Sequence, residues 1–131
     1  MSGLIIKEPS KKDYVFGSGQ LQGKVIRPDG NWGEYLPRNE DQKKQDIETS
    51  ACVTFSILKC IAILMEEMGL GEDFDFSERY ISLLSGTTKI GNDPLTVAET
   101  IRKNGLIPQS MMPFNDSIQS WEDFNSFKGA D

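Results

Sequence analysis

The stretch QDIETSACVTFSILKCIAILMEEMG, residues 45–69, decides how this chain folds. Apolar side chains fill nearly every side of a helix that begins after Thr49 or Ser50, either of which can serve as its N-cap. Gly69 is a natural stop for such a helix. A helix that is apolar nearly all round is buried against several other elements. We therefore expect a long, buried central helix.

Cys52 falls in the first turn of this expected helix. One interpretation is a nucleophile whose thiolate is favoured by the helix dipole and the first-turn amides. The other is a small core residue, because cysteine is among the most buried residue types. Cys60 lies eight residues later, about 12 Å along the helix, and is too distant to form a disulfide with Cys52. We expect Cys60, Met65 and Met68 to be core residues.

The composition limits the kinds of partner and cofactor that the chain is expected to bind. The 131 residues suffice for one domain with a core but not for two large domains. The net charge of -6, from 20 acidic and 14 basic residues, disfavours nucleic acid and anionic membranes as partners. The chain has no histidine and no clustered cysteines, so it carries no transition-metal signature, and we expect neither a metal nor an organic cofactor.

The sequence gives few signals of location. Its first residues contain too short an apolar run for a signal peptide. The apolar run 57–65 is interrupted by Lys59 and is far shorter than the roughly 20 residues of a membrane span. Two unpaired thiols favour a reducing compartment. These signals leave the location open and favour the cytoplasm.

The chain divides into two parts by pattern. Residues 1–45 have little periodicity and are expected to form an extended arm or lead-in, with short strands possible at 3–7 and 23–27. Residues 46–131 are expected to form a helical subdomain. Because the sequence ends soon after the last expected helix begins to show apolar residues, we expect this subdomain to be incomplete at its C-terminus.

Three further helices are expected in residues 46–131. Their predicted N-caps are Ser77, Asp93 and Ser120. The first should bury an apolar stripe made of Phe76, Tyr80, Leu83 and Leu84. The second begins with Pro94 and ends at Gly105, which follows the usual preference for proline at the start and glycine at the end of a helix.

Four blocks of residues resemble papain-like cysteine peptidases. SACVTFS (50–56) is similar to the block that carries the nucleophile at the start of the family's central helix, and FSERYI (76–81) to the Leu-Ser-Glu-Gln block after it. GNDPLTVAETIRKNGL (91–106) and MPF (112–114) resemble the family's Gly-Gly and Tyr-Pro-Tyr blocks. The resemblance covers roughly residues 32–114. It implies a mainly α fold: the papain-like N-terminal helical half of an α+β family, without its β-rich second half.

The resemblance implies that Cys52 occupies the nucleophile position. Departures from the family pattern are Val53 for its aromatic residue, Ser50 for a glycine, and Thr49 for a half-cystine, so that the family's cleft disulfide is absent. The catalytic histidine and asparagine belong to the missing half. Acyl transfer by a thiol needs a base and an acid. We therefore expect the isolated chain to be inactive.

The resemblance also implies an oxyanion-hole glutamine and a substrate rail. Gln42 and Gln45 compete for the oxyanion position, although either could be a solvated loop residue. Gly91, Asn92 and Pro94 would border the substrate cleft, with the backbone of 91–92 pairing with an extended peptide. A turn followed by a capped helix explains the same three residues without a ligand.

Two functional hypotheses follow. The first is the N-terminal half of a papain-like cysteine peptidase, whose substrate is a peptide and whose histidine comes from a second segment or chain. The second is a catalytically silent papain-derived module that packs in a larger assembly. A virion is one such assembly, because the lead-in YLPRNEDQ before ACVTFS is similar to papain-like segments of phage proteins. Both hypotheses need a partner that covers the exposed helical half. A helical domain unrelated to peptidases is a third possibility.

Overall fold

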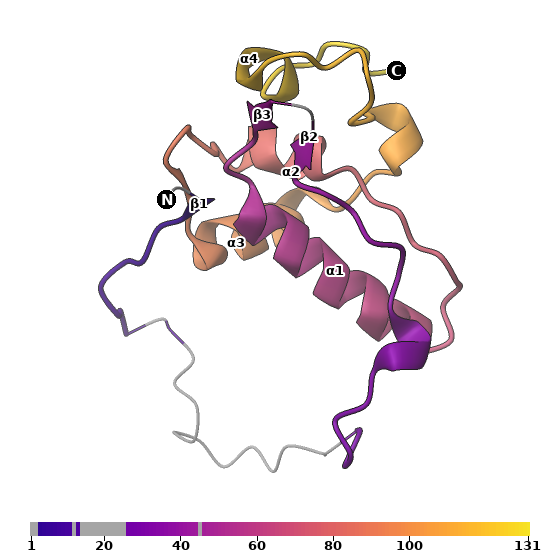
Figure 1. The fold of residues 1–131 in the computed structure, drawn as a ribbon. Coiled ribbons are helices and arrows are strands. Elements are labelled where there is room, and N and C mark those ends of the chain that lie inside the picture. Colours follow the sequence, from indigo (N-terminus) through magenta and orange to yellow (C-terminus); the bar gives the residue numbers. More distant parts are fainter. Residues whose placement is uncertain (1–2, 12, 14–25, 45) are drawn as a thin grey trace.

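The computed structural model describes residues 3–11, 13, 26–44 and 46–131, which form a small, mainly α domain (Figure 1). The mainly α class predicted from the sequence is confirmed. The elements in chain order are β1 (Gly3–Leu4), η1 (Gly33–Tyr35), β2 (Lys43–Lys44), β3 (Ile47–Glu48), α1 (Cys52–Glu67), α2 (Glu78–Leu84), β4 (Gly91–Asn92), α3 (Pro94–Asn104), η2 (Gln109–Met111) and α4 (Trp121–Phe124). Strands pair β1 with β4 in parallel and β2 with β3 antiparallel.

The structure agrees with the predicted ends of α1 but not with its predicted N-cap. The helix begins at Cys52 and is followed by Gly69, whose φ of 75° ends it as predicted. The N-cap position is Ala51, which has no side-chain oxygen, so the predicted threonine or serine cap is wrong. The first-turn N–H groups of α1 are therefore left without a capping side chain from its own N-cap.

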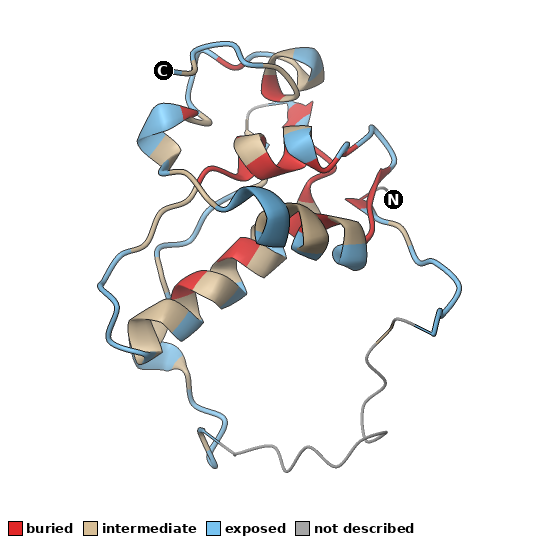
Figure 2. Cartoon of the chain, turned by 180° about the vertical axis from the view of Figure 1, so that it is seen from behind, coloured by how far each residue is buried: buried red, intermediate tan, exposed pale blue. Residues whose placement is uncertain are grey.

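α1 is buried along one face, and the expectation of a helix buried all round is wrong. Figure 2 shows buried residues near its N-terminal end and mostly intermediate or exposed residues toward its C-terminal end. α2 and α3 pack against α1 and against each other. The buried residues of α1 are Val53, Thr54, Leu58 and Ala62. Because that packing leaves the far end of the helix uncovered, Cys60 and Met68 are exposed rather than in the core, and Leu64 is exposed as well.

Two apolar clusters form the core. The first joins α1, α2 and α3 through Val53, Leu58, Ile81 and Val97. The second joins the β2–β3 hairpin, the start of α1 and the C-terminal segment through Ile47, Ala51, Ile118 and Phe124. This second cluster explains why the hairpin lies between α4 and the start of α1 in Figure 1. The hairpin therefore reaches the N-terminal end of α1, where Cys52 lies.

Three of the predicted helix caps are confirmed. The side-chain oxygens of Ser77, Asp93 and Ser120 accept hydrogen bonds from backbone N–H groups three residues later. Pro94 starts α3, and Gly105, with φ 73°, follows its last residue. Of the two predicted short strands, the first is seen at residues 3–4. Residues 23–25 of the other lie outside the described residues.

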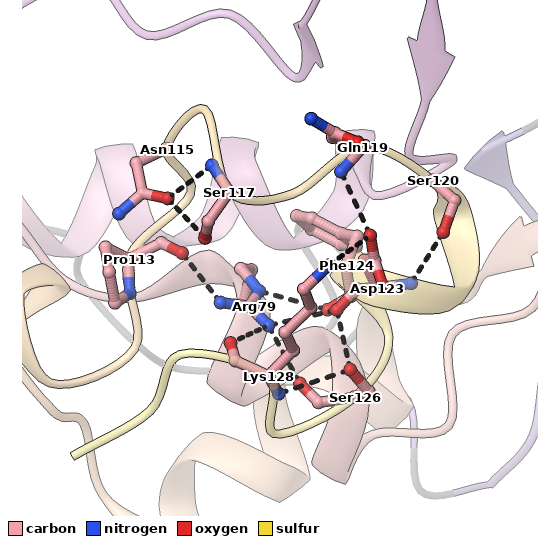
Figure 3. Close-up of polar contacts among 10 residues, drawn as sticks. All are labelled: Arg79, Pro113, Asn115, Ser117, Gln119, Ser120, Asp123, Phe124, Ser126 and Lys128. Carbon is pink, nitrogen blue, oxygen red and sulfur yellow. Dashed lines mark hydrogen bonds and ion pairs between the residues drawn. The ribbon is translucent and has the colours of Figure 1, made fainter.

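The buried face of α2 differs from the predicted stripe. Its buried residues are Glu78, Arg79, Ile81 and Ser82, whereas Leu84 is exposed. Arg79 is fully buried and donates hydrogen bonds to backbone carbonyls of the C-terminal segment (Figure 3). The accepting carbonyls belong to Pro113, Asp123, Phe124, Ser126 and Lys128. A single guanidinium thus fastens residues 113–128 to α2, because its fixed fork of donors can bind several acceptors at once.

Candidate active site around Cys52

The residues before Cys52 tie the start of α1 to the turn before β4. Ser50 has φ 54°, a left-handed conformation that is uncommon for a residue with a side chain. Its N–H donates to Glu48 Oε1 at 3.1 Å, and its Oγ donates to the Lys89 carbonyl at 2.8 Å. This serine stands where the resembled family has a glycine, and it keeps a glycine-like conformation. The bond to Lys89 brings β4 next to Cys52.

Asn92 anchors the turn that precedes β4. Its buried amide donates to the Ser85 carbonyl at 3.1 Å, to Ser85 Oγ at 3.0 Å and to Thr87 Oγ1 at 3.2 Å. Its Oδ1 accepts from the Asp93 N–H at 2.9 Å. Because the side chain is held inside the turn, Asn92 offers only its backbone to a neighbouring strand. The strand that pairs with this backbone is the chain's own, and the expectation that residues 91–92 bind a substrate through the backbone stays a prediction.

The backbone of β4 carries an extended segment. The Gly3 N–H donates to the Ile90 carbonyl at 2.7 Å, and the Ile5 N–H donates to the Asn92 carbonyl at 2.8 Å. Gly91 has φ 122°, and a Cβ atom there would overlap the backbone of Gly3. Only glycine allows the two strands to approach this closely. β1 therefore lies on the backbone that was predicted to bind a substrate.

The same segment covers the Cys52 thiol. A Cβ atom added to Gly3 would stand 2.5 Å from Cys52 Sγ, so the backbone of β1 passes directly over the sulfur. Cys52 is partly buried and packs at the edge of the core cluster formed by Val53, Leu58, Ile81 and Val97. Its sulfur thus has the core on one side and a strand of only two residues on the other.

A salt bridge holds the N-terminal segment against α3. Lys7 Nζ lies 2.7 Å from Asp93 Oδ2 and donates to Thr96 Oγ1 at 3.3 Å. Burial of Asp93 opposes its ionisation, but hydrogen bonds from Lys7 and Thr96 outweigh this effect and lower the pKa of Asp93 to about 2. Pro94, predicted to border the cleft, is exposed beside this bridge as the first residue of α3.

The structure places only one of the two candidate oxyanion glutamines. The Gln42 carbonyl accepts a hydrogen bond from Thr49 Oγ1 at 2.7 Å, so the β2–β3 hairpin brings Gln42 next to a residue three positions before Cys52. Among the described residues, no hydrogen bond joins the Gln42 side chain to Cys52. Gln45 lies outside the described residues.

Sequence reasoning missed a cluster of carboxylates away from Cys52. One carboxylate oxygen from each of Glu40, Asp75 and Glu78 lies within 4.8 Å of the others. Burial, reinforced by the neighbouring Glu40 carboxylate, raises the pKa of Glu78 to about 9. The three residues are separated by up to 38 positions, and only the packing of α2 against the lead-in brings them together. No pattern in the sequence signalled that Glu78 is buried, because the predicted apolar stripe of Phe76, Tyr80, Leu83 and Leu84 does not include it.

Comparisons with protein-family models, with curated proteins and with solved structures found no match to this chain. Within the described part of the chain, every helix is too short or too polar to cross a bilayer.

Proposed function

We propose that this chain is the N-terminal half of a papain-like cysteine peptidase, with Cys52 as its nucleophile. The single observation that carries the proposal is the path of β1. An extended backbone lies on Gly91 and Asn92 and passes over Cys52 Sγ. A peptide substrate of a thiol peptidase has to lie in the same way, held by strand pairing with its backbone beside the nucleophile.

The start of α1 suits a nucleophile. Cys52 is the first residue of a 16-residue helix whose N-cap supplies no side-chain oxygen, so first-turn N–H groups remain for a developing negative charge. The Cys52 N–H itself would be one oxyanion donor. Gln42 is the better candidate for the second, because the hairpin brings it near this helix end.

The chain lacks the base that peptide hydrolysis needs. It contains no histidine, and the carboxylate nearest in sequence, Glu48, already accepts a hydrogen bond from Ser50. Without a group that can deprotonate the thiol and protonate the leaving amine, turnover cannot be completed. The proposal therefore includes a second protein segment or chain that supplies histidine and asparagine and covers the exposed helices.

Labelling with a peptidyl chloromethyl ketone tests this function. Cys52 attacks the reagent's methylene carbon through its thiolate, a new S–C bond forms, and chloride leaves. We expect the peptidyl reagent to label Cys52 in Gly3→Val, whose added side chain displaces β1 from the position of the peptide, in preference to Cys60 by a larger factor than iodoacetamide, which lacks the peptide. Peptide substrates should not be turned over by the chain alone.

Variants of Cys52 and Gly91 are the matched controls. In the Gly3→Val background, Cys52→Ser should abolish the peptide-dependent labelling, and Gly91→Val should weaken it by blocking the backbone on which the peptide pairs. Equal labelling of both cysteines by both reagents would contradict the proposal. Turnover that Cys52→Ser abolishes would show that the chain needs no second half.

A catalytically silent module is the second candidate. The observation that favours it is that β1 already occupies the position a substrate would take, while α1 exposes Leu64 and the following Met68 and Leu70 to solvent. Exposed apolar residues of this size favour contact with another protein. If this candidate is right, the chain binds an assembly partner, and Cys52→Ser does not weaken that binding.

A further inference from the structure

One carboxylate oxygen from each of Glu40, Asp75 and Glu78 lies within 4.8 Å of the others. Asp75 Oδ2 pairs with Arg38 at 3.0 Å, and Glu40 Oε2 pairs with Lys59 Nζ at 3.1 Å. Two of the three carboxylates therefore have one oxygen paired with a positive side chain.

Two carboxylate oxygens of this cluster are buried and have no hydrogen-bond partner among the described residues. Glu78 is only 2% exposed, and none of the described residues donates to its Oε2. Asp75 Oδ1 is also buried and lacks a partner. A buried carboxylate oxygen without a partner costs several kcal/mol, so a proton or a bound cation is expected between these groups.

The Gln109 side chain offers a neutral oxygen near the same carboxylates. Gln109 Oε1 is buried and unpartnered, and the Gln109 N–H donates to the Asp75 carbonyl at 2.9 Å. Gln109 lines a cavity of about 280 Å³ together with Glu40 and Glu78. The cavity also gives room for water molecules, which complete the coordination of hard cations.

We propose that Glu40, Asp75 and Glu78 form a binding site for Ca²⁺, with Gln109 as a further oxygen donor. The donors are all oxygen, which suits hard cations rather than transition metals. Carboxylate oxygens within 4.8 Å of one another can be bridged by Ca²⁺, whose ligands lie at about 2.3–2.6 Å, whereas Mg²⁺ at about 2.1 Å would require the site to contract.

A proton competes with Ca²⁺ for this site. Three carboxylates with Lys59 and Arg38 beside them carry a net charge of -1, which one proton on Glu78 would neutralise. Lys43 and Lys44 also line the cavity and weaken the attraction for a cation. We therefore expect weak binding, in the range of about 10⁻⁴–10⁻³ M that sites with few charges show. The proposal departs from the sequence-based expectation that the chain needs no metal.

Thermal unfolding of the full chain at pH 8 tests the site, with 10 mM Ca²⁺, 10 mM Mg²⁺ or a chelator present. We expect Ca²⁺ to raise the unfolding midpoint of the wild-type chain by about 3–6 °C, and Mg²⁺ by less. Glu78→Gln keeps the shape of the side chain and should abolish the Ca²⁺ shift, as should Asp75→Asn. Glu72→Gln, which changes an exposed carboxylate on the loop leading to Asp75, should retain it.

Comparing Ca²⁺ with Mg²⁺ separates specific binding at this site from general screening of the chain's net charge of -6. A Ca²⁺ shift under 1 °C in the wild-type chain would overturn the proposal and leave a proton as the occupant. So would an equal shift with Mg²⁺, or a Ca²⁺ shift that persists in both Glu78→Gln and Asp75→Asn. Calorimetric titration of Ca²⁺ into the wild-type chain and Glu78→Gln provides the second measurement, with binding heat expected only in the wild type.

Discussion

At the scale of single residues, Arg79 has the largest structural role in this chain. Its guanidinium binds carbonyls at both ends of the segment 113–128 and is fully buried (Figure 3). Hydrogen bonds that involve a charged group contribute about 1.5–3 kcal/mol each, and a buried carbonyl left unpaired adds to the loss. The C-terminal segment therefore depends on one side chain of α2.

Arg79→Lys should destabilise the protein by about 3 kcal/mol or more. The lysine ammonium has three donors from one point and cannot reach the carbonyls that the planar guanidinium spans. Urea unfolding measures the change. Arg102→Lys is the matched control, because Arg102 is exposed on α3 and pairs only with Glu99 at the surface, so it should change stability by less than about 0.5 kcal/mol. Equal effects of the two substitutions would contradict this role.

Glu78 predicts a pH dependence of stability. In the folded chain it keeps its proton up to about pH 9, while in the unfolded chain it ionises near its usual pKa of about 4.3. A raised carboxyl pKa means that the unfolded state releases the proton first, so the free energy of unfolding falls as pH rises between these values.

Glu78→Gln should therefore raise the free energy of unfolding at pH 7.5 by more than about 1 kcal/mol, because an amide has no charge to lose. The gain should vanish at pH 3, where Glu78 is protonated in both states. Urea unfolding in a chelator at the two pH values measures it, with Glu72→Gln as the exposed control. A loss of stability at pH 7.5 would show that Glu78 is ionised in the folded chain.

At the scale of elements, the N-terminal segment is held by β4 and by the start of α3. Asp93 both caps α3 and pairs with Lys7, and its lowered pKa of about 2 lies below the unfolded value of about 3.9. The stabilisation from the Asp93 carboxylate is therefore present above about pH 4 and lost as pH falls toward 2.

Asp93→Asn separates the cap from the ion pair. Asparagine caps helices as well as aspartate does, so the change mainly removes the charge. Because Lys7 is largely exposed, solvent screens the pair, and we expect a loss of about 1–2 kcal/mol at pH 7 that disappears at pH 2. Asp116→Asn, which breaks a surface pair with Lys44, should cost under about 0.5 kcal/mol. A pH-independent loss in Asp93→Asn would contradict the pKa argument.

Elements with local signals could be predicted from the sequence. Ser77, Asp93 and Ser120 cap helices because a short polar side chain reaches N–H groups three residues on, which is a local property. The buried faces could not be predicted in the same way. Glu78 and Arg79 are buried because of carbonyls and carboxylates from distant segments, and no periodicity of apolar residues reports such partners.

The candidate site also combines features with local signals and features that depend on long-range contacts. Cys52 in the first turn of α1 follows from local pattern, whereas the extended backbone of 91–92 was expected from the resemblance, and the structure has both. The bond from Ser50 to Lys89 and the close approach of Gly3 to the sulfur join residues far apart in the chain, so no local pattern predicts them. The peptidase role of Cys52 stays a proposal.

At the scale of the whole molecule, the uncovered end of α1 predicts association. Leu64, near the end of α1, and Met68 and Leu70, just after it, are exposed. Sedimentation velocity between about 10 and 100 µM should give a sedimentation coefficient that rises with concentration, because apolar surface of this kind is stabilised by contact. Met68→Ser with Leu64→Ser should reduce the rise. A concentration-independent monomer would argue against an uncovered interface.

The alkylation rates of the two cysteines test the central claim most directly. Gly3→Val places a side chain against Cys52 Sγ and should release β1, because the φ of 129° also disfavours valine. With iodoacetamide at pH 6.5 and mass-spectrometric readout, we predict that Cys52 reacts more slowly than Cys60 in the wild-type chain. In Gly3→Val it should react at least about tenfold faster than Cys60. If Cys52 in Gly3→Val stays slower than Cys60 until the protein is unfolded, then Cys52 is a core residue and the account is contradicted.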